Sequence, residues 1–167
     1  MNLELDELKR NLEQLTNKLD QYDEKFFWIT DDWNQELSRQ AVTGFSIRQD
    51  YDAAKAISSS IENTLQLVES TINLNIRNYC TNPVVETLPF NFLDTEAHLI
   101  SQPVPQKPTE KVFHDLVISS EPYQHVNTLL LKAKICENQW SNIYSSWMNR
   151  GIALSNLVKL ATDISNS

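Results

Sequence analysis

The side chains able to support nucleophilic or metal chemistry are few and scattered: Cys80, Cys136, His98, His114 and His125. A catalytic cysteine needs a base nearby, and neither cysteine stands at a recognisable spacing from a histidine. Zinc sites use closely spaced cysteine and histidine ligands, and no CxxC pair occurs. We therefore interpret both cysteines as small apolar packing residues. We expect no enzymatic activity, no catalytic residue, no metal and no cofactor.

Two further classes of motif are missing from the sequence. The chain has only 2 glycines, so neither a GxGxxG fingerprint nor a phosphate-binding P-loop can form. A di-metal site in a helical bundle uses Glu-x-x-His on facing helices, and the sequence has none. Glu137 interrupts an apolar helical stripe, and we interpret it as a partly exposed residue that fixes helix register rather than as a ligand. The low glycine content itself favours long helices with few turns.

Size and charge restrict the class of protein. The 167 residues suggest one domain, or two if the chain is elongated, and the net charge is −8. An acidic chain is a poor ligand for nucleic acid or an anionic membrane surface. No secretory signal opens the sequence, and no apolar run approaches the roughly 18 residues that span a bilayer. With two thiols and no disulfide framework, we expect a cytoplasmic protein with reduced cysteines.

The first forty residues predict a long helix from about residue 2 to about residue 41. They contain no glycine or proline, and Thr30, Asp31 and Asp32 offer a possible break near Ile29. Their apolar residues alternate spacings of three and four, the heptad period of a coiled coil. This first seam consists of Leu5, Leu8, Leu12, Leu15, Leu19, Tyr22, Phe26, Ile29 and Trp33.

A turn at Thr43 and Gly44 is expected next, followed by a second helix from about 47 to about 80. Ser46 and Gln49 have the spacing of a capping box. Two heptad helices joined by a short turn predict an antiparallel hairpin over residues 1–80. The second seam consists of Ile47, Tyr51, Ala54, Ser58, Ile61, Leu65, Val68, Ile72, Asn75 and Tyr79.

Residues 81–121 predict a proline-rich extended arm. Proline blocks helix interiors. The segment is nevertheless too rich in large apolar residues for a flexible linker, so we expect its first half to lie along a hydrophobic groove. Thr109 to Ser119 predicts a short helix, whose buried edge comprises Val112, Phe113, Leu116 and Val117. The prolines of the chain are Pro83, Pro89, Pro103, Pro105, Pro108 and Pro122.

Residues 122–167 predict a C-terminal long helix that starts at Pro122, reaches about Thr162 and packs on the hairpin or on partners. A second apolar set lies off its seam, and a helix apolar on more than one face is surrounded by neighbours. The seam is Val126, Leu130, Ala133, Glu137, Trp140, Tyr144, Trp147, Gly151, Leu154, Val158 and Ala161. The second set is Leu129, Leu131, Ile135, Ile143, Ile152, Leu157 and Ile164.

The expected fold class is therefore all-α: an elongated coiled-coil helical hairpin plus a third long helix, joined by the proline-rich extended segment. Phe26, Phe27 and Trp28 form an aromatic cluster near Trp33, but only Phe26 and Trp33 fit the seam. Phe27 and Trp28 either pack against the last helix of the same chain or anchor a partner subunit. Trp140 and Trp147 are seven residues apart, a spacing more typical of a core than of a cofactor site.

The chain has more large apolar side chains than a helical hairpin can bury. This predicts a constitutive subunit of a hetero-oligomeric helical assembly. Its partners would be other coiled-coil proteins. The predicted partner-binding residues are Leu12, Leu15, Leu19, Phe26, Phe27, Trp28, Trp33, Leu65, Val68, Ile72, Leu88, Phe90, Phe92, Leu130, Trp140, Trp147 and Leu154.

Arg77, near the end of the second predicted helix, is followed by Pro83, by the pair Leu88 and Pro89, and by the last predicted helix. This order of parts resembles the small wee-Augmin-type subunit of the augmin (HAUS) complex. In that family a leading coiled coil ends in an arginine, and a proline, a Leu-Pro pair and a second coiled coil follow. Arg77, Pro83, Leu88 and Pro89 stand at the matching positions, over roughly residues 60–160. The residues of the last helix that resemble the second coil are Pro122, Leu129, Leu130 and Leu154.

The resemblance implies a structural subunit of a complex that docks on spindle microtubules and recruits the γ-tubulin ring complex to nucleate new microtubules. It also implies a location on the spindle cytoskeleton. Because tubulin's surface is acidic, we expect any microtubule contact to be indirect, through basic partner subunits. The alternatives are another coiled-coil assembly, such as a kinetochore linker or vesicle tether, and a self-sufficient helical bundle that binds a small ligand near Trp140 and Trp147.

Overall fold

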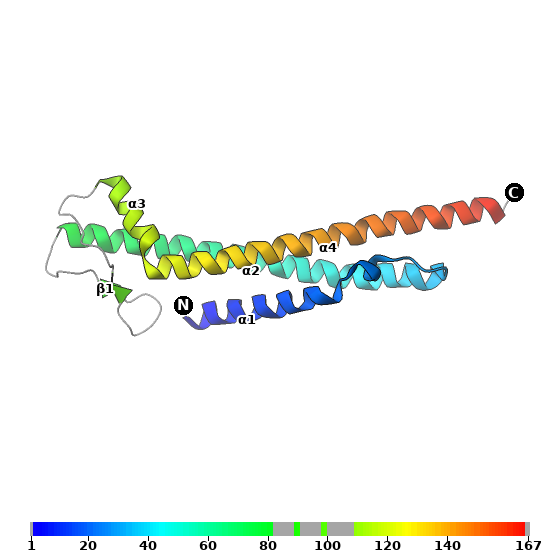
Figure 1. Ribbon diagram of the computed structural model, residues 1–167, viewed down its shortest axis with the longest axis horizontal. Coiled ribbons are helices and arrows are strands. Elements are labelled where there is room, and N and C mark those ends of the chain that lie inside the picture. The colour runs from blue at the N-terminus through cyan, green and yellow to red at the C-terminus, as the bar shows by residue number, and fades with distance from the viewer. Residues whose placement is uncertain (1, 82–88, 91–97, 100–108, 166–167) are drawn as a thin grey trace. The chain divides into compact units, whose positions relative to one another are not determined.

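The computed structural model of the chain describes residues 2–81, 89–90, 98–99 and 109–165, and the side chains of residues 4–77 and 109–164 (Figure 1). Nearly all of these residues are helical, which confirms the predicted all-α class. The long helices are α1 (Asn2–Lys18), α2 (Trp33–Thr81) and α4 (Glu121–Ser165), and α3 (Glu110–Ser119) is short. The strands β1 (Pro89–Phe90) and β2 (His98–Leu99) form an antiparallel pair with Pro89 opposite Leu99.

The predicted boundary between the first two helices is wrong. α1 ends at Lys18, and α2 runs unbroken from Trp33 through the expected turn at Thr43 and Gly44. A single glycine inside a helix costs only about 1 kcal/mol relative to alanine, so Gly44 does not by itself end one. The predicted capping box at Ser46 and Gln49 is also wrong, because both residues lie inside α2.

The chain turns instead in the segment between α1 and α2, which contains two short 3-10 helices, η1 (Leu19–Gln21) and η2 (Glu24–Phe27). Two aspartates begin new helical turns there. The Asp23 carboxylate accepts a hydrogen bond from the Phe26 amide at 2.9 Å, and the Asp32 carboxylate accepts one from the Gln35 amide at 3.1 Å. Such side chains satisfy amide groups that a helix leaves unpaired at its start. Local capping therefore places the turn at residues 19–32.

Gly44 is needed for close packing rather than for a turn. A Cβ at this position would lie 2.9 Å from Nε1 of Trp147 on α4. The Trp147 side chain is fully buried and bulky, so it has no room to withdraw. Glycine thus lets α2 approach the indole of α4.

The prediction for the short helix is confirmed, since α3 begins directly after Thr109. The Thr109 hydroxyl accepts a hydrogen bond from the Val112 amide, as an N-cap does. Phe113, Leu116 and Val117 are buried, and Val112 is half-buried. The last helix also begins and ends within a few residues of its predicted limits.

The chain forms two compact units. The first comprises Met1–Lys9 and Ser58–Ala133, and the second comprises Arg10–Ile57 and Lys134–Ser167. In the first unit, the Arg77 guanidinium at the end of α2 pairs with Glu110 of α3 and lies 4.5 Å from the centroid of the Phe113 ring. The buried apolar residues of this unit are Leu5, Ile61, Val68, Ile72, Ile76, Phe113, Leu116, Val117, Val126, Leu129, Leu130 and Ala133.

In the second unit, α2 and α4 run antiparallel, because contacts pair Gln40 with Trp147 and Tyr51 with Tyr144. Figure 1 shows the chain turning back between α1, in blue, and α2, in cyan. The buried apolar residues of this unit are Leu12, Leu15, Ile47, Ala54, Ile57, Cys136, Trp140, Trp147 and Leu154.

The heptad seams mark the side that each helix buries, whereas the second apolar set of α4 is largely exposed. From that set, Leu129 is buried and Ile143 is half-buried, but the remaining five residues are exposed. The predicted coiled-coil hairpin, the extended arm and the division into 1–80, 81–121 and 122–167 remain predictions. Most of the arm lies outside the described residues.

Candidate functional site

A buried polar cluster lies in the second unit, which we call the Arg150 cluster. Arg150 of α4 forms an ion pair with Glu36 of α2, and both side chains are almost completely buried. The Arg150 guanidinium also donates to the Gln40 side-chain oxygen at 2.7 Å and to the Trp28 backbone oxygen at 3.3 Å. Gln40 in turn donates from Nε2 to the Trp147 backbone oxygen at 2.9 Å. Two helices and the turn segment therefore meet at one guanidinium.

The same cluster fixes the turn between α1 and α2. One oxygen of Glu36 accepts hydrogen bonds from the Thr30 amide at 3.1 Å and the Thr30 hydroxyl at 2.9 Å. Arg39 donates to the Phe26 backbone oxygen at 2.7 Å. Since charged hydrogen bonds are stronger than neutral ones, these contacts hold residues 26–30 firmly against α2.

Aromatic rings surround the buried ions. The ring centroids of Phe26 and Phe27 lie 5.3 and 6.3 Å from that of Trp147. The Arg150 guanidinium carbon is 4.6 Å from the centroid of the Trp147 ring, and that of Arg39 is 4.9 Å from the centroid of the Phe26 ring. Cation–π contacts of this kind stabilise guanidinium groups that have lost water. Phe27 thus packs on the last helix of its own chain, one of the two interpretations considered above.

Burial opposes ionisation of Glu36, but hydrogen bonds from Thr30 and the Arg150 guanidinium outweigh it and lower the pKa of this carboxyl below its usual value. The carboxylate therefore stays ionised at neutral pH. A permanently ionised, internally paired carboxylate is suited to structural support rather than to proton transfer.

Both buried indoles donate their N–H groups within the chain. Trp140 donates to the Leu15 backbone oxygen at 3.3 Å, and Trp147 donates to the Gln40 backbone oxygen at 3.1 Å. Tyr22 packs edge-on against Trp140, and burial and then the nearby charge of Asp50 raise the pKa of its phenol. The two tryptophans serve as core residues, in agreement with their seven-residue spacing.

Cys136 is buried beside Thr16 and Trp140, and burial raises the pKa of its thiol. A thiol that stays protonated at neutral pH is a poor nucleophile. This agrees with the interpretation of Cys136 as a packing residue. The side chain of Cys80 lies outside the described residues.

A row of large apolar side chains is exposed on α4 in the second unit. Leu157, Leu160 and Ile164 follow one another at spacings of three and four and are 40%, 59% and 76% exposed. This is the spacing of a coiled-coil seam, here left exposed by the part of the chain that the structure describes. Large exposed apolar patches are typical of interaction surfaces. We call Leu157, Leu160 and Ile164 the α4 face.

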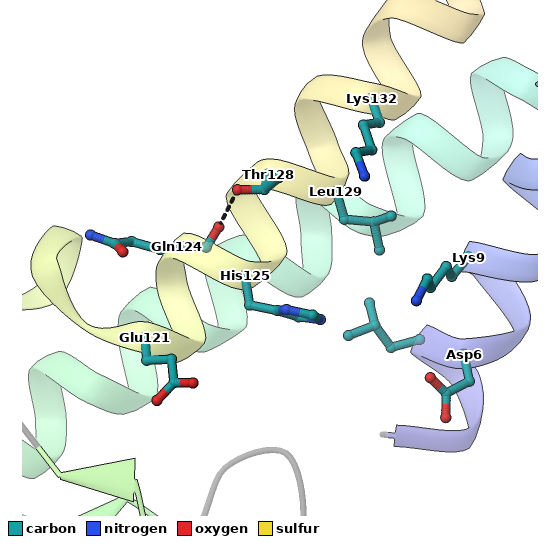
Figure 2. A pocket seen from close by; sticks show the side chains of 9 residues that line it. Asp6, Lys9, Glu121, Gln124, His125, Thr128, Leu129 and Lys132 are labelled. Atoms are coloured by element: carbon teal, nitrogen blue, oxygen red, sulfur yellow. Dashed lines mark hydrogen bonds between the residues drawn. The ribbon is translucent and has the colours of Figure 1, made fainter.

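A pocket of about 510 Å³ lies in the first unit, between α1 and α4. Figure 2 shows the side chains of Lys9 and His125 pointing toward one another, with Lys132 above them. All three are exposed at the surface. The other residues that line the pocket are Leu5, Asp6, Glu121, Gln124, Thr128 and Leu129. We call this site the basic pocket.

The structure distributes the predicted partner-binding residues over both units. Leu12, Leu15, Val68, Ile72, Leu130, Trp140, Trp147 and Leu154 are buried by the chain itself. Leu19, Phe26, Phe27, Trp33 and Leu65 are half-buried, and Trp28 is 59% exposed. The side chains of Leu88, Phe90 and Phe92 lie outside the described residues. Phe26, Phe27 and Trp147 form ring contacts with one another in the second unit, where Trp140 contacts Tyr22 and Trp28 is held through its backbone oxygen.

The Arg150 cluster was missed by the sequence reasoning, although its spacing is visible. Glu36, Gln40 and Gly44 continue the three–four spacing from Trp33 to Ile47, which makes one uninterrupted seam through α2. Arg150 likewise fits between Trp147 and Leu154. The apolar periodicity passed over these polar positions, where Glu36, Gln40 and Arg150 in fact bond to one another.

Lys9 and Lys132 were missed, and His125 was considered only as a possible base or metal ligand, because nothing in the sequence connects the three and only folding brings α1 next to α4. Within the described residues, none of the helices combines the length and apolar content needed to cross a bilayer. In comparisons with known proteins, no family model, curated protein or solved structure matches the chain.

Proposed function

We propose that this protein is a non-catalytic structural subunit of a hetero-oligomeric coiled-coil complex. The α4 face is the observation that supports this best. Leu157, Leu160 and Ile164 repeat at heptad spacing, and all three are exposed. Burying one such side chain is worth about 1.5–3 kcal/mol, so a partner helix would gain substantially by covering all three.

The rest of the second unit is suited to present such a face rigidly. Arg150, one turn before Leu154, ties α4 to α2 through Glu36 and Gln40. A preordered surface loses less conformational freedom on association than a flexible one. In this proposal the buried cluster is the support and the α4 face is the contact.

The finer form of the proposal is an augmin-type subunit, which would support γ-tubulin recruitment and microtubule nucleation on the spindle. It rests on the resemblance carried by Arg77, Pro83, Leu88 and Pro89. The net charge of −8 is in keeping with it, because basic partner subunits would then make the contact with acidic tubulin. Another coiled-coil assembly, such as a kinetochore linker or vesicle tether, would use the α4 face in the same way.

The first experiment measures the mass of the purified chain by light scattering, with circular dichroism on the same peak. Self-association, a loosely folded helical species, or solubility only with co-expressed partners is expected. The co-purifying chains would identify the complex, and γ-tubulin among them would support the augmin form. A compact monomer that melts cooperatively would contradict an obligate subunit.

A triple variant of the α4 face tests partner binding separately from folding. We expect the triple change Leu157→Gln, Leu160→Gln and Ile164→Gln to abolish co-purification while helix content and melting temperature stay the same, because glutamine and leucine have similar helix propensities. The matched control is Val42→Gln and Phe45→Gln, two residues of α2 that are also exposed. If the control loses the partners and the triple variant keeps them, the contact lies on α2 instead.

A further inference from the structure

The basic pocket has an unusual arrangement of charge. Lys9, His125 and Lys132 converge on one cavity (Figure 2), and within the described part of the chain none of the three forms a hydrogen bond or an ion pair. Two carboxylates also line the cavity: Glu121 is engaged in a contact of its own, and Asp6 forms no ion pair with the three basic residues within the described residues. Basic groups that face one cavity without ion pairs of their own keep unused hydrogen-bond donors, which a bound anion can accept from.

This arrangement is the more notable because its surroundings are acidic. The first unit has five lysines and arginines and eleven aspartates and glutamates, a net charge of −6. Lys9 and Lys132 are two of those five basic residues, and they line the same cavity. Acidic residues that could pair with exposed lysines are therefore plentiful in this unit, yet Lys9 and Lys132 form no ion pair within the described residues.

The chemistry of the pocket restricts its ligand. Lysine ammonium groups are donors only, and a protonated imidazole adds two donors, so the ligand must supply several acceptor oxygens. The volume of about 510 Å³ falls within the roughly 300–1,000 Å³ typical of small-molecule sites. Asp6 and Glu121 would repel a long polyanion such as nucleic acid. One compact oxyanion, with carboxylates beside it, fits best.

We propose that the basic pocket binds a small phosphate-bearing molecule through Lys9, Lys132 and His125. Leu5 and Leu129 form its apolar wall, against which the organic part of the ligand lies. The proposal does not depend on the complex described above. An isolated chain can bind the anion whether or not the α4 face has a partner.

The test titrates the full-length chain with inorganic phosphate and pyrophosphate, followed by calorimetry and by the shift in melting temperature, at fixed low ionic strength. We expect saturable binding that weakens as sodium chloride is added, because salt screens charge. Each of Lys9→Gln and Lys132→Gln should weaken binding about tenfold, as loss of a charged hydrogen bond does. The control is Lys111→Gln, which changes an exposed lysine of α3 in the same unit and should bind like the unchanged protein.

Three results would overturn the proposal. The first is no saturable binding of either anion to the unchanged protein. The second is equal weakening by Lys111→Gln, which would make the effect one of net charge. The third is binding to phosphatidic acid vesicles but not to soluble phosphate, which would assign the lysines to a lipid surface. Circular dichroism of each variant verifies that the helices are intact.

Discussion

The Arg150 cluster and the basic pocket both place cationic side chains between helices, but they differ in burial and in pairing. Arg150 is buried, and its guanidinium meets a carboxylate, an amide oxygen, a backbone oxygen and an indole face. Lys9 and Lys132 are exposed and have no such partners within the described residues. In the first arrangement the chain pairs the guanidinium at both terminal nitrogens and leaves only Nε of Arg150 without a hydrogen-bond partner, whereas the second offers its donors to a ligand from outside.

The difference separates structural from binding roles for the same kind of charge. A buried cation without a counter-ion would cost several kilocalories per mole, so Arg150 is tolerated only because Glu36 is present. An exposed lysine keeps its water and imposes no such demand. Convergence of unpaired lysines is therefore informative about ligands, and burial of a paired arginine is informative about stability.

The largest expected effect comes from removing one member of the buried pair. Arg150→Met leaves the Glu36 carboxylate without its main partner, and we expect a loss of about 3–5 kcal/mol in the free energy of unfolding. Urea denaturation measures it. Arg48→Gln is the control, because the pair that Arg48 forms with Asp52 is exposed and should be worth about 0.3–0.5 kcal/mol. Equal effects of the two substitutions would show that the Arg150 pair is not buried in solution.

The pH dependence of stability provides a second contrast. Folding lowers the pKa of Glu36 below its usual value of 4.5, so between the two pKa values the unfolded state binds more protons. The stabilisation is fully present above pH 4.5 and is lost as the pH falls through the folded pKa. We expect the melting temperature to fall with acid more steeply in the unchanged protein than in Glu36→Gln. Parallel curves would contradict a role for this carboxylate.

Gly44→Ala tests the close approach of α2 to Trp147. Alanine favours the helix by about 1 kcal/mol, but overpacking against a rigid ring typically costs about 1–3 kcal/mol. We expect a net loss, seen as a lower urea midpoint. Ser59→Ala, at an exposed position of α2, is the control and should stabilise the protein slightly. Stabilisation by Gly44→Ala would show that the indole does not lie against this glycine.

The smallest expected effect is on the basic pocket without ligand. Lys132→Gln removes a charge that has no partner within the described residues, so we expect unfolding free energy to change by at most about 0.5 kcal/mol. The same chemical unfolding experiment that detects Arg150→Met would detect a larger change. A loss above about 1 kcal/mol would mean that Lys132 has a structural partner, which would weaken the case for a ligand.

Much of the fold could be predicted because helix-forming patterns are local. The alternation of three and four residues identified the sides of α2 and α4 that are buried, from Ile47 to Ile72 and from Val126 to Leu154. The Thr109 cap and Pro122 located the beginnings of α3 and α4 to within a residue. These signals act over one or two helical turns, and they are the same in an isolated peptide and in the folded chain.

The sequence did not locate the turn between α1 and α2, because two segments of the chain both contain residues that disfavour a continuous helix. Gly44 disfavours a helix, whereas Asp23 and Asp32 cap new helical turns earlier in the chain. The close packing of α2 against Trp147 requires a glycine inside the helix, and Gly44 and Trp147 lie about a hundred positions apart in the sequence. The sequence predicted the turn at Thr43 and Gly44 and gave Thr30, Asp31 and Asp32 only as a possible break, whereas the structure ends one helix before that break and starts the next directly after Asp32.

By itself, then, the sequence determined the all-α class, the helices after residue 109, their buried sides and the surplus of apolar side chains on α4. Only the tertiary structure decided which polar residues pair inside, as Glu36 does with Arg150, and which basic residues line a shared pocket. The physical reason is the separation along the sequence over which each kind of interaction acts. Helix propensity and periodicity depend on neighbours within a few residues, whereas charge pairing and pocket formation depend on side chains that folding alone brings together.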